Sequence, residues 1–352
     1  MPIMLSIVQT VLYGLGAILG FGFLVLIHEL GHFWAYKSLG RPVHSFSIGF
    51  GSPWWRRTWR GTEYRLGWLP LGGYVMLEDP DLVEKREQAG EPLFPNLTPF
   101  EQIWSAIWGP LANVLATVAL FAVLIGIWGQ PTPVPVVDSL VASGAASMAG
   151  LQRGDRIVTL DGVTITSWEH LLATVQKCSD RQVRVEVERG GQVQSLAIQA
   201  RKDGEAYRIG VRPQMRATGP LPWPSACVAA VQNTWQQTVQ VVTTLARLFT
   251  GGGGADVAGP IAILGLTSRA VEQGWEAFIT LLAILSINLA WFNLLPVPPL
   301  DGLRIMLASL QAIKGRPLDE RYVLPVFEYG ALALAVLFLL ITLKDVGGLL
   351  FT

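Results

Sequence analysis

Cysteine and charge are both scarce in this chain, and each scarcity excludes a class of protein. The 2 cysteines, Cys178 and Cys227, cannot build a disulfide scaffold and lie too far apart in the sequence to form a zinc clip. Only 15% of the 352 residues are charged, whereas a soluble domain carries about 25%. The 26 basic and 26 acidic residues also cancel, which excludes a nucleic-acid-binding protein that works through bulk positive charge.

Hydrophobic residues and tryptophan are abundant instead. The chain is 51% hydrophobic, has a mean hydropathy of +0.42 and contains 13 Trp. Tryptophan favours the boundary between lipid and water, and so apolar a composition excludes a disordered chain. We therefore predict an integral membrane protein with some soluble mass.

Four stretches lack charged residues for long enough to cross a bilayer, which takes about 20 residues of helix. They are 1–27, 102–137 with an apolar centre at 103–128, 277–300, and the shortest one, 329–343. The first stretch has no basic beginning and is too long for a cleaved signal peptide, so we expect it to be a retained helix.

The placement of basic residues predicts an orientation. Eight basic residues lie in the first connection, 37–101, and four lie in the short connection before the last stretch, while the amino-terminal stub has none. Basic connections face the cytoplasm. We therefore expect both of these connections in the cytoplasm, and both termini and the long segment between the second and third stretches outside.

That outer segment has the pattern of a small folded domain. Residues 134–137 and 182–187 alternate like strands, 167–176 is typical of a short helix capped by Ser167, and Gly-containing pairs at 161–162 and 190–191 predict tight turns. The run 149–157 and the Leu-Asp-Gly at 160–162 resemble the core signature of bacterial PDZ domains. We predict a PDZ-like domain at 131–215, whose edge strand can pair with an extended peptide; the alternative is another small α+β domain.

The next segment, 216–276, begins with an amphipathic pattern. Apolar residues recur every three or four positions from Val228 to Phe249, with Gln and Thr on the other faces. We expect a helix that lies on the membrane or against the helix bundle, followed by a flexible break at the four glycines 251–254.

The first hydrophobic stretch runs into the sequence His-Glu-Leu-Gly-His at 28–32. Residues four apart share one face of a helix, so His28 and His32 can reach a single Zn²⁺, and Glu29 lies beside it, where it can take a proton from a bound water. Three ionisable side chains at membrane depth are costly without a compensating partner. We therefore predict metal binding and catalysis here rather than a chance match.

A catalytic zinc usually has three protein ligands and a water, so a third ligand is needed. Asp301 is the best candidate, because it is the only carboxylate between Glu276 and Asp319. It follows three prolines at 296–299 that cannot continue an ordinary helix, so the chain should break there and bring Asp301 toward another helix. The alternative is that this carboxylate caps a helix at 302–310.

Taken together, these motifs resemble one family, the site-2 proteases, and specifically the bacterial regulated intramembrane metalloproteases that cut anti-sigma factors. The match covers nearly the whole chain in the family's order. It rests on the PDZ-like run and four motifs: His-Glu-Leu-Gly-His at 28–32, Gly-Pro-Leu-Ala-Asn at 109–113, Ala-Gly-Pro-Ile-Ala at 258–262, and Asn-Leu-Leu-Pro-Val-Pro-Pro-Leu-Asp-Gly at 293–302.

The resemblance implies one Zn²⁺ per chain, held by His28, His32 and Asp301, with Glu29 as general base. It also implies that Asn288 and Asn293 line the site and bond the substrate backbone; the alternative for both is packing between helices. The stretches 45–50 and 65–76 should form a membrane-associated hairpin that pairs with the substrate through the residues Gly72, Gly73, Tyr74 and Val75.

The expected fold is therefore an α-helical polytopic membrane protein of about four transmembrane helices, with a membrane-associated β-hairpin region and an inserted α+β PDZ-like domain. Residues 1–130 and 277–352 form the two halves of its membrane domain. The resemblance places it in the bacterial cytoplasmic membrane, with the active site toward the cytoplasm. Its partners are single-pass membrane-protein substrates, cut beforehand by another protease, and the lipid bilayer.

This chain departs from the family pattern at two places, and two other functions are alternatives to proteolysis. Well-studied members often carry two PDZ domains, whereas this chain has room for one, and the usual Leu-Asp-Gly-Gly ends in Leu303 here. A non-catalytic membrane adaptor with a structural zinc site is the alternative function. A metal transporter would need more polar residues along several membrane helices than this chain offers.

Overall fold

The structure is a computed structural model that describes residues 2–77, 97–141, 144–178, 181–203, 206–249, 259–316 and 318–350. The chain divides into two compact units. The helical unit comprises Met1–Gly126 and Pro222–Thr352, and the inserted unit comprises Ile127–Leu221. The helical unit carries all of the candidate catalytic residues.

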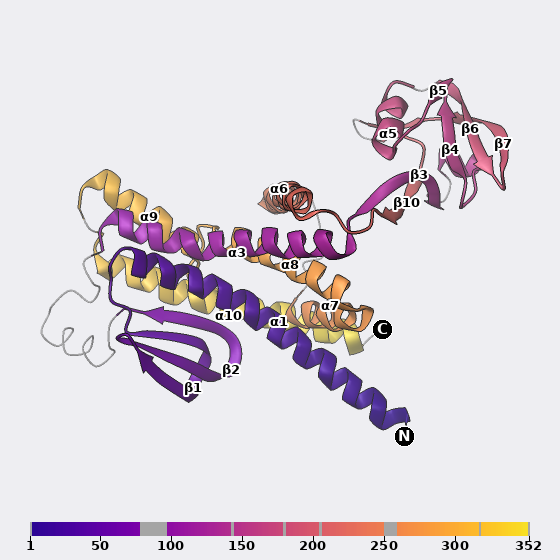
Figure 1. Cartoon of the computed structure of the whole chain (residues 1–352). Helices are drawn as coiled ribbons and strands as arrows, with labels where there is room; N and C mark the ends of the chain where they lie inside the picture. Colours follow the sequence, from indigo (N-terminus) through magenta and orange to yellow (C-terminus); the bar gives the residue numbers. More distant parts are fainter. Residues whose placement is uncertain are drawn as a thin grey trace, which may run out of the picture. The chain divides into compact units, whose positions relative to one another are not determined.

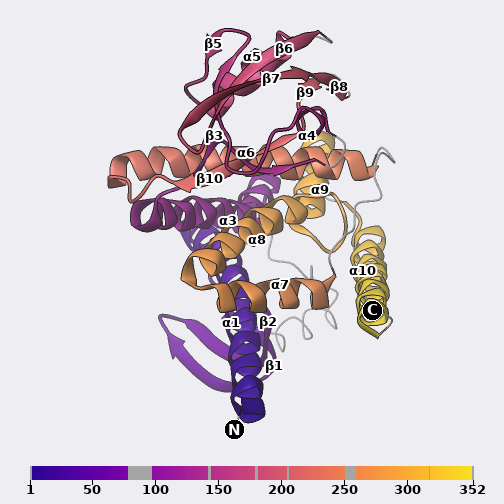
Figure 2. The ribbon, with the colours of Figure 1, turned by 90° about the vertical axis from the view of Figure 1, so that its right-hand side faces the viewer.

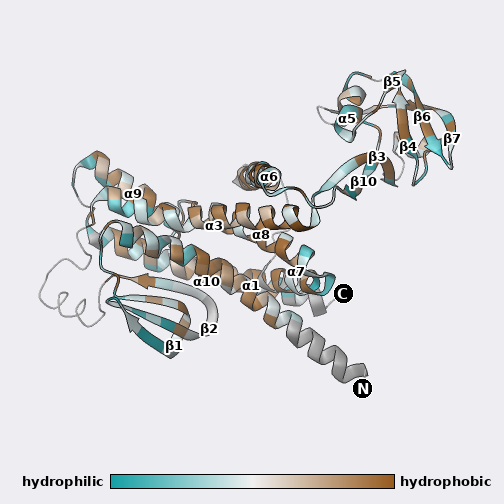
Figure 3. Cartoon of the chain, in the orientation of Figure 1, coloured by the Kyte–Doolittle hydropathy of each residue, from teal (hydrophilic) through white to brown (hydrophobic). Residues whose placement is uncertain are grey.

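Four helices in the described part of the chain are long and apolar enough to cross a membrane. Figure 3 shows, in brown, the hydrophobic residues along the described parts of these helices. The four helices are α1 (Pro2–Ser38), α3 (Pro99–Trp128), α8 (Trp275–Asn293) and α10 (Glu320–Leu350). Each contains one of the four predicted stretches or most of it, and the third helix ends at Asn293, just before the prolines that were expected to break it.

Three further helices lie in the described part of the helical unit: α6 (Trp223–Phe249), α7 (Pro260–Gln273) and α9 (Asp301–Lys314). The helix α6 is the predicted amphipathic helix, and several apolar residues of its stripe are exposed, including Val228, Val231 and Trp235. The helix α7 was not predicted. It packs across α1 and also contacts α8 and α10 (Figure 2).

A capping box starts α3 and ties it to the end of α1. The Thr98 backbone N–H donates to Glu101 Oε2 at 2.8 Å, and the Glu101 N–H donates to Thr98 Oγ1 at 3.3 Å. The Arg41 guanidinium, just beyond α1, donates two hydrogen bonds to the same Glu101 carboxylate, at 2.9 and 2.7 Å. These contacts help to fix the spacing of the two helices that frame the site.

The hairpin consists of β1 (Ser45–Trp59) and β2 (Thr62–Met76), which pair antiparallel and are longer than the predicted 45–50 and 65–76 (Figure 1). The strand β2 bends, so residues 45–48 of β1 pair with 63–66 on one side and with 73–76 on the other. Residues 73–76 thus form an edge segment that pairs with no second strand among the described residues. The strand β2 packs against α1, which brings this edge segment to the motif at 28–32.

The inserted unit is built on an antiparallel sheet with strand order β10-β3-β4-β6-β7. These strands are β3 (Pro131–Leu140), β4 (Arg156–Leu160), β6 (Gln182–Arg189), β7 (Gln192–Gln199) and β10 (Val211–Ala217). The shorter elements are β5 (Val163–Thr164) beside β4, the paired β8 (Arg201–Asp203) and β9 (Ala206–Arg208), and the helices α4 (Ala145–Met148) and α5 (Trp168–Gln176).

Local chemistry explains how the inserted unit folds as an α+β domain. Ser167 Oγ accepts the backbone N–H of His170 at 3.1 Å and so caps α5 as predicted. Both predicted turns are present, and each contains residues of positive φ. Apolar residues of the strands and of α5 close one core, in which Ile157, Leu171 and Val185 are almost fully buried.

One buried ion pair stabilises this unit. Asp155 is 1% exposed, and its two carboxylate oxygens each accept a hydrogen bond from Arg189 at 2.7 Å. These hydrogen bonds from the Arg189 guanidinium hold the pKa of the Asp155 carboxyl below its usual value.

Candidate metal centre

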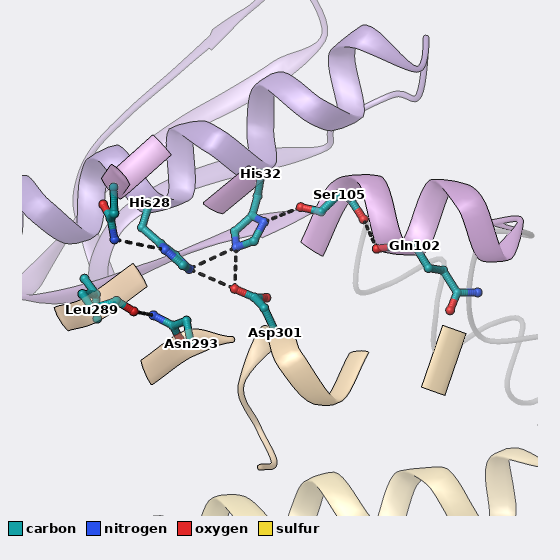
Figure 4. A network of polar contacts seen from close by, with 8 residues as sticks. His28, His32, Gln102, Ser105, Leu289, Asn293 and Asp301 are labelled. Atoms are coloured by element: carbon teal, nitrogen blue, oxygen red, sulfur yellow. Dashed lines mark hydrogen bonds and ion pairs between the residues drawn. The ribbon is translucent and has the colours of Figure 1, made fainter. Parts of the chain in front are cut away.

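Three side chains from distant parts of the sequence converge in the helical unit. His28 and His32 project from α1, and Asp301 projects from the start of α9 (Figure 4). Asp301 Oδ2 lies 3.1 Å from His28 Nε2 and 3.2 Å from His32 Nε2, and the two Nε2 atoms lie 3.2 Å apart. All three residues are buried, at 6–8% exposure.

The local sequence explains this convergence. The two histidines lie one helical turn apart on α1. The helix α8 ends at Asn293, a tight turn follows, and Asp301 is the first residue of α9. Gly302 is required next, because a Cβ there would collide with the backbone carbonyls of Leu294 and Leu295. Asp301 does not serve as the cap of α9, since Leu300 occupies that position without a side-chain cap hydrogen bond.

The spacing of the three atoms fits a small, tetrahedrally coordinated metal ion. Ligand atoms at about 2.0–2.2 Å from a tetrahedral zinc are separated from one another by about 3.3–3.6 Å. The observed separations of 3.1 to 3.2 Å are close to those values. Two imidazoles and one carboxylate are also the kind of donor set that leaves a fourth position open in catalytic zinc sites. The residues therefore fit the metal that the sequence predicts.

The second ring nitrogen of each histidine faces α3. His32 Nδ1 donates to the backbone carbonyl of Ser105 at 2.7 Å, and His28 Nδ1 lies 3.3 Å from the side-chain amide nitrogen of Asn113. Gly109 lies between Ser105 and Asn113 on the same face of α3, where a Cβ would collide with both imidazole rings. Sequence reasoning assigned no role to Ser105, Gly109 or Asn113; the motif at 109–113 was a signal for Gly109 and Asn113, and the sequence held none for Ser105.

A cavity of about 440 Å³ opens beside the three donors. It is lined by Glu29, by residues of the edge segment of β2 and by residues around the start of α9. Glu29 is half-buried and has no hydrogen bond or ion pair among the described residues. The edge segment approaches it closely at Gly73, where a Cβ would lie 2.7 Å from the Ser47 carbonyl oxygen and 2.9 Å from Glu29 Cγ. The Glu29 carboxylate is thus available to whatever enters the cavity.

The predicted substrate-binding residues are distributed unevenly around this cavity. Five of them line it, namely Gly72, Gly73, Tyr74, Val75 and Asn293. Asn288 is not among its lining residues, and its amide donates to the Ile284 carbonyl of its own helix at 2.7 Å. The role predicted for Asn288 stays a prediction.

Arg304 is a cavity residue that sequence reasoning missed. It lies one turn beyond Asp301 on α9 and is exposed. Its guanidinium makes no hydrogen bond or ion pair within the part of the chain that the structure describes. The i, i+3 spacing from Asp301 was the signal that could have identified it.

Comparison with known proteins identifies relatives of this chain. The model of peptidase family M50 matches residues 16–338. The regulator of sigma-E protease RseP of Escherichia coli is 28% identical, over 93% of this chain and 97% of that protein. The zinc metalloprotease RasP of Geobacillus kaustophilus is 27% identical, over 93% of this chain and 96% of that protein. The alignment with RseP extends over 442 positions, so that protein contains segments which the 352 residues of this chain lack.

A solved structure, the PDZ domain of the SdrC-like protein of Listeria monocytogenes, is also similar. It is 20% identical and covers 22% of this chain and 84% of its own, with a TM-score of 0.21. That score is too low to assign a fold to the inserted unit by itself.

Proposed function

This chain belongs to peptidase family M50, and we propose that it is an intramembrane zinc endopeptidase of the site-2 type. It hydrolyses peptide bonds within or near the transmembrane segments of other membrane proteins. The observation that carries this proposal is the convergence of His28, His32 and Asp301 at the wall of a cavity that Glu29 also lines, in a unit whose described part contains four helices long and apolar enough to cross a membrane. The zinc metalloproteases among the relatives support the choice of metal and reaction.

The three converging side chains would hold one zinc ion per chain, through the Nε2 atoms of both histidines and the carboxylate of Asp301. When bound, the ion supplies a Lewis acid and a bound water that ionises near neutral pH. The protein contributes the fixed positions of its ligands: α1 holds the two imidazoles, and the turn before α9 holds the carboxylate.

Glu29 carries the proton during hydrolysis. It is one residue from His28, lines the same cavity and has no competing hydrogen bond among the described residues. Its carboxylate accepts a proton from the attacking water and returns a proton to the nitrogen of the leaving amine. The absence of a fixed partner favours this role, because a carboxylate locked in a salt bridge would exchange protons less readily.

The edge segment of the hairpin explains how a membrane helix becomes a substrate. Peptide carbonyls in an intact helix are shielded by their i to i−4 hydrogen bonds, so the substrate must unwind locally before attack. An extended strand that pairs with residues 73–76 regains hydrogen bonds while it lies against the cavity. Asn293 lines the cavity and orients the substrate backbone.

The substrates we propose are single-pass membrane proteins, such as anti-sigma factors, that another protease has already trimmed. The regulator of sigma-E protease among the relatives supports this class. The membrane we propose is a bacterial inner membrane, with the active site toward the cytoplasmic side and both termini and the PDZ-like domain at 131–215 outside; the distribution of basic residues supports this orientation.

The alternative is a membrane adaptor in which the zinc is structural. A structural zinc site is closed by four protein ligands, whereas only three candidate ligands cluster here among the described residues, and a cavity adjoins them. This difference favours catalysis.

The test is Glu29→Gln in the full-length protein, reconstituted with a model membrane substrate. Loss of the carboxylate removes the proton acceptor and keeps the metal ligands. We expect cleavage to be abolished while zinc content equals that of the wild type. Normal cleavage by this variant would show that Glu29 is not the base, and absence of cleavage by the wild type with trimmed substrates would favour the adaptor.

A further inference from the structure

The side chain of Asn113 is fully buried on α3, and the two ends of its amide group differ in their polar contacts. Its amide nitrogen Nδ2 lies 3.3 Å from His28 Nδ1, while its carbonyl oxygen Oδ1 is buried and has no hydrogen-bond partner among the residues that the structure describes. A buried acceptor without a partner is destabilising, because it has lost its hydrogen bonds to water and gained none. The two ends of an amide have nearly the same shape, so its hydrogen-bond partners decide which end faces the ring.

The protonation of His28 determines which end of the amide suits the site. If Nδ2 donates to Nδ1, then the ring of a neutral His28 carries its proton on Nε2 and donates it toward Asp301 Oδ2, 3.1 Å away. A histidine in that tautomer cannot offer Nε2 to a metal. A ring that binds metal through Nε2 carries its proton on Nδ1, and two donors would then face each other across 3.3 Å.

We propose that Asn113 is a positioning residue that presents its Oδ1 to the Nδ1–H of His28 in the metal-loaded protein. The hydrogen bond fixes the ring in the tautomer and orientation that direct Nε2 at the metal. This inference rests on the proposed function, since it assigns to Asn113 a role toward the same metal. It also provides a partner for the buried Oδ1, which has no other partner in the described part of the chain.

The surroundings of Asn113 hold its backbone in place for this task. Its backbone carbonyl accepts hydrogen bonds from Thr117 Oγ1 and from Ser286 Oγ of α8, each at 2.9 Å. Both hydroxyl groups belong to fully buried residues. The position of Asn113 is therefore fixed by α3 and α8 together, while its side chain remains available to contact His28 of α1.

The other histidine has an equivalent partner, which makes α3 the supporting helix for both rings. His32 Nδ1 donates to the Ser105 carbonyl at 2.7 Å, which already fixes the tautomer that leaves His32 Nε2 free. Ser105, Gly109 and Asn113 follow at intervals of four residues on one face of α3. In this proposal the motif at 109–113 has two roles. Gly109 has no side chain and so lets α3 lie close to both rings, and Asn113 provides the acceptor for His28.

The first test measures zinc affinity by competition with a chelator, using the full-length protein in lipid nanodiscs. Asn113→Leu keeps the approximate volume and removes the acceptor, and we expect zinc affinity to fall by about 10–100-fold. Asn113→Asp keeps an oxygen acceptor and should bind zinc about as tightly as the wild type. Wild-type affinity in Asn113→Leu, or equal weakening in both variants with melting temperatures unchanged, would overturn the proposal.

The second test needs no variant that must fold. The chain has only 4 histidines, so isotope labelling of histidine nitrogen gives a small set of NMR signals. In the zinc-loaded wild type we expect the His28 Nδ1 proton to show the downfield shift and slow exchange of a hydrogen-bonded group. A rapidly exchanging Nδ1 proton would contradict the role of Asn113. A wild type that binds no zinc would instead refute the proposed function, so the two failures are distinguishable.

Discussion

Gly109 offers a demanding test of the site geometry, because it touches both imidazole rings and bears no functional group. An added methyl at this position of α3 would have its carbon 2.9 Å from His28 Cε1 and closer still to the His32 ring. Ordinary contacts between carbon atoms lie at about 3.5–4.0 Å. Gly109→Ala must therefore displace the rings by about 0.6–1 Å, away from the positions that aim both Nε2 atoms at Asp301.

The size of the effect follows from the cost of overpacking. An extra methyl group in a closely packed interior costs about 1–3 kcal/mol when its neighbours must shift. The rings can relieve the overlap by moving away from the metal position, so the cost should appear mainly as lost metal affinity. We expect zinc binding to weaken by about 5- to 150-fold, with a parallel loss of peptide hydrolysis.

The assay compares zinc affinity in Gly109→Ala, Gly14→Ala and the wild type. Gly14 lies in the membrane helix α1, and a Cβ added there meets no other described part of the chain within 4 Å, so its replacement controls for the change from glycine to alanine in a helix. The control should bind zinc normally. If Gly109→Ala also binds zinc and cleaves substrate like the wild type, then the rings do not rest against α3 as described.

Two further predictions concern the hairpin and the inserted unit. Gly73→Ala would place a carbon 2.9 Å from Glu29 Cγ, so it should reduce cleavage while leaving zinc content unchanged; undiminished cleavage would show that the edge segment does not approach Glu29 during catalysis. Because Arg189 lowers the pKa of Asp155 in the folded state, the pair stabilises the inserted unit fully above the ordinary aspartate pKa of about 3.9, and that stabilisation is lost as the pH falls through the lowered value. Asp155→Asn should lower the free energy of unfolding of the inserted unit by about 1.5–3 kcal/mol at neutral pH and make it depend less on pH in acid. Hydrogen exchange of β4 and β6 in the full-length protein measures both effects. An unchanged dependence on pH would mean that a group other than Asp155 causes it.

Local patterns predicted much of this molecule. Helical spacing alone places His28 and His32 on one face, and the isolated position of Asp301 after the prolines identified it as the third member of the cluster. Charge-free stretches located the four long apolar helices, and alternation and turn residues located strands of the inserted unit. The helices, strands and turns depend on a few neighbouring residues, so the sequence displays them directly; Asp301 was identified instead by the need for a third ligand and the scarcity of carboxylates in its segment.

Several other features that depend on contacts between distant segments were not predicted. The helix α7 is short, and its packing on α1, α8 and α10 supports it more than any cap does. The bend of β2 that exposes residues 73–76 is visible only in the register with β1. Asn288 and Asn293 have similar sequence surroundings, yet only Asn293 lines the cavity, because their different rotations about α8 decide what each can reach.

The central claim is that one zinc ion is held between α1 and the start of α9, and metal analysis of the purified full-length protein tests it most directly. We expect one zinc per chain in the wild type, with two imidazoles and a carboxylate in its X-ray absorption spectrum, and little or none after Asp301→Ala. Wild-type protein that lacks zinc when purified without chelators, or Asp301→Ala protein that retains full zinc with an unchanged ligand set, would contradict the account.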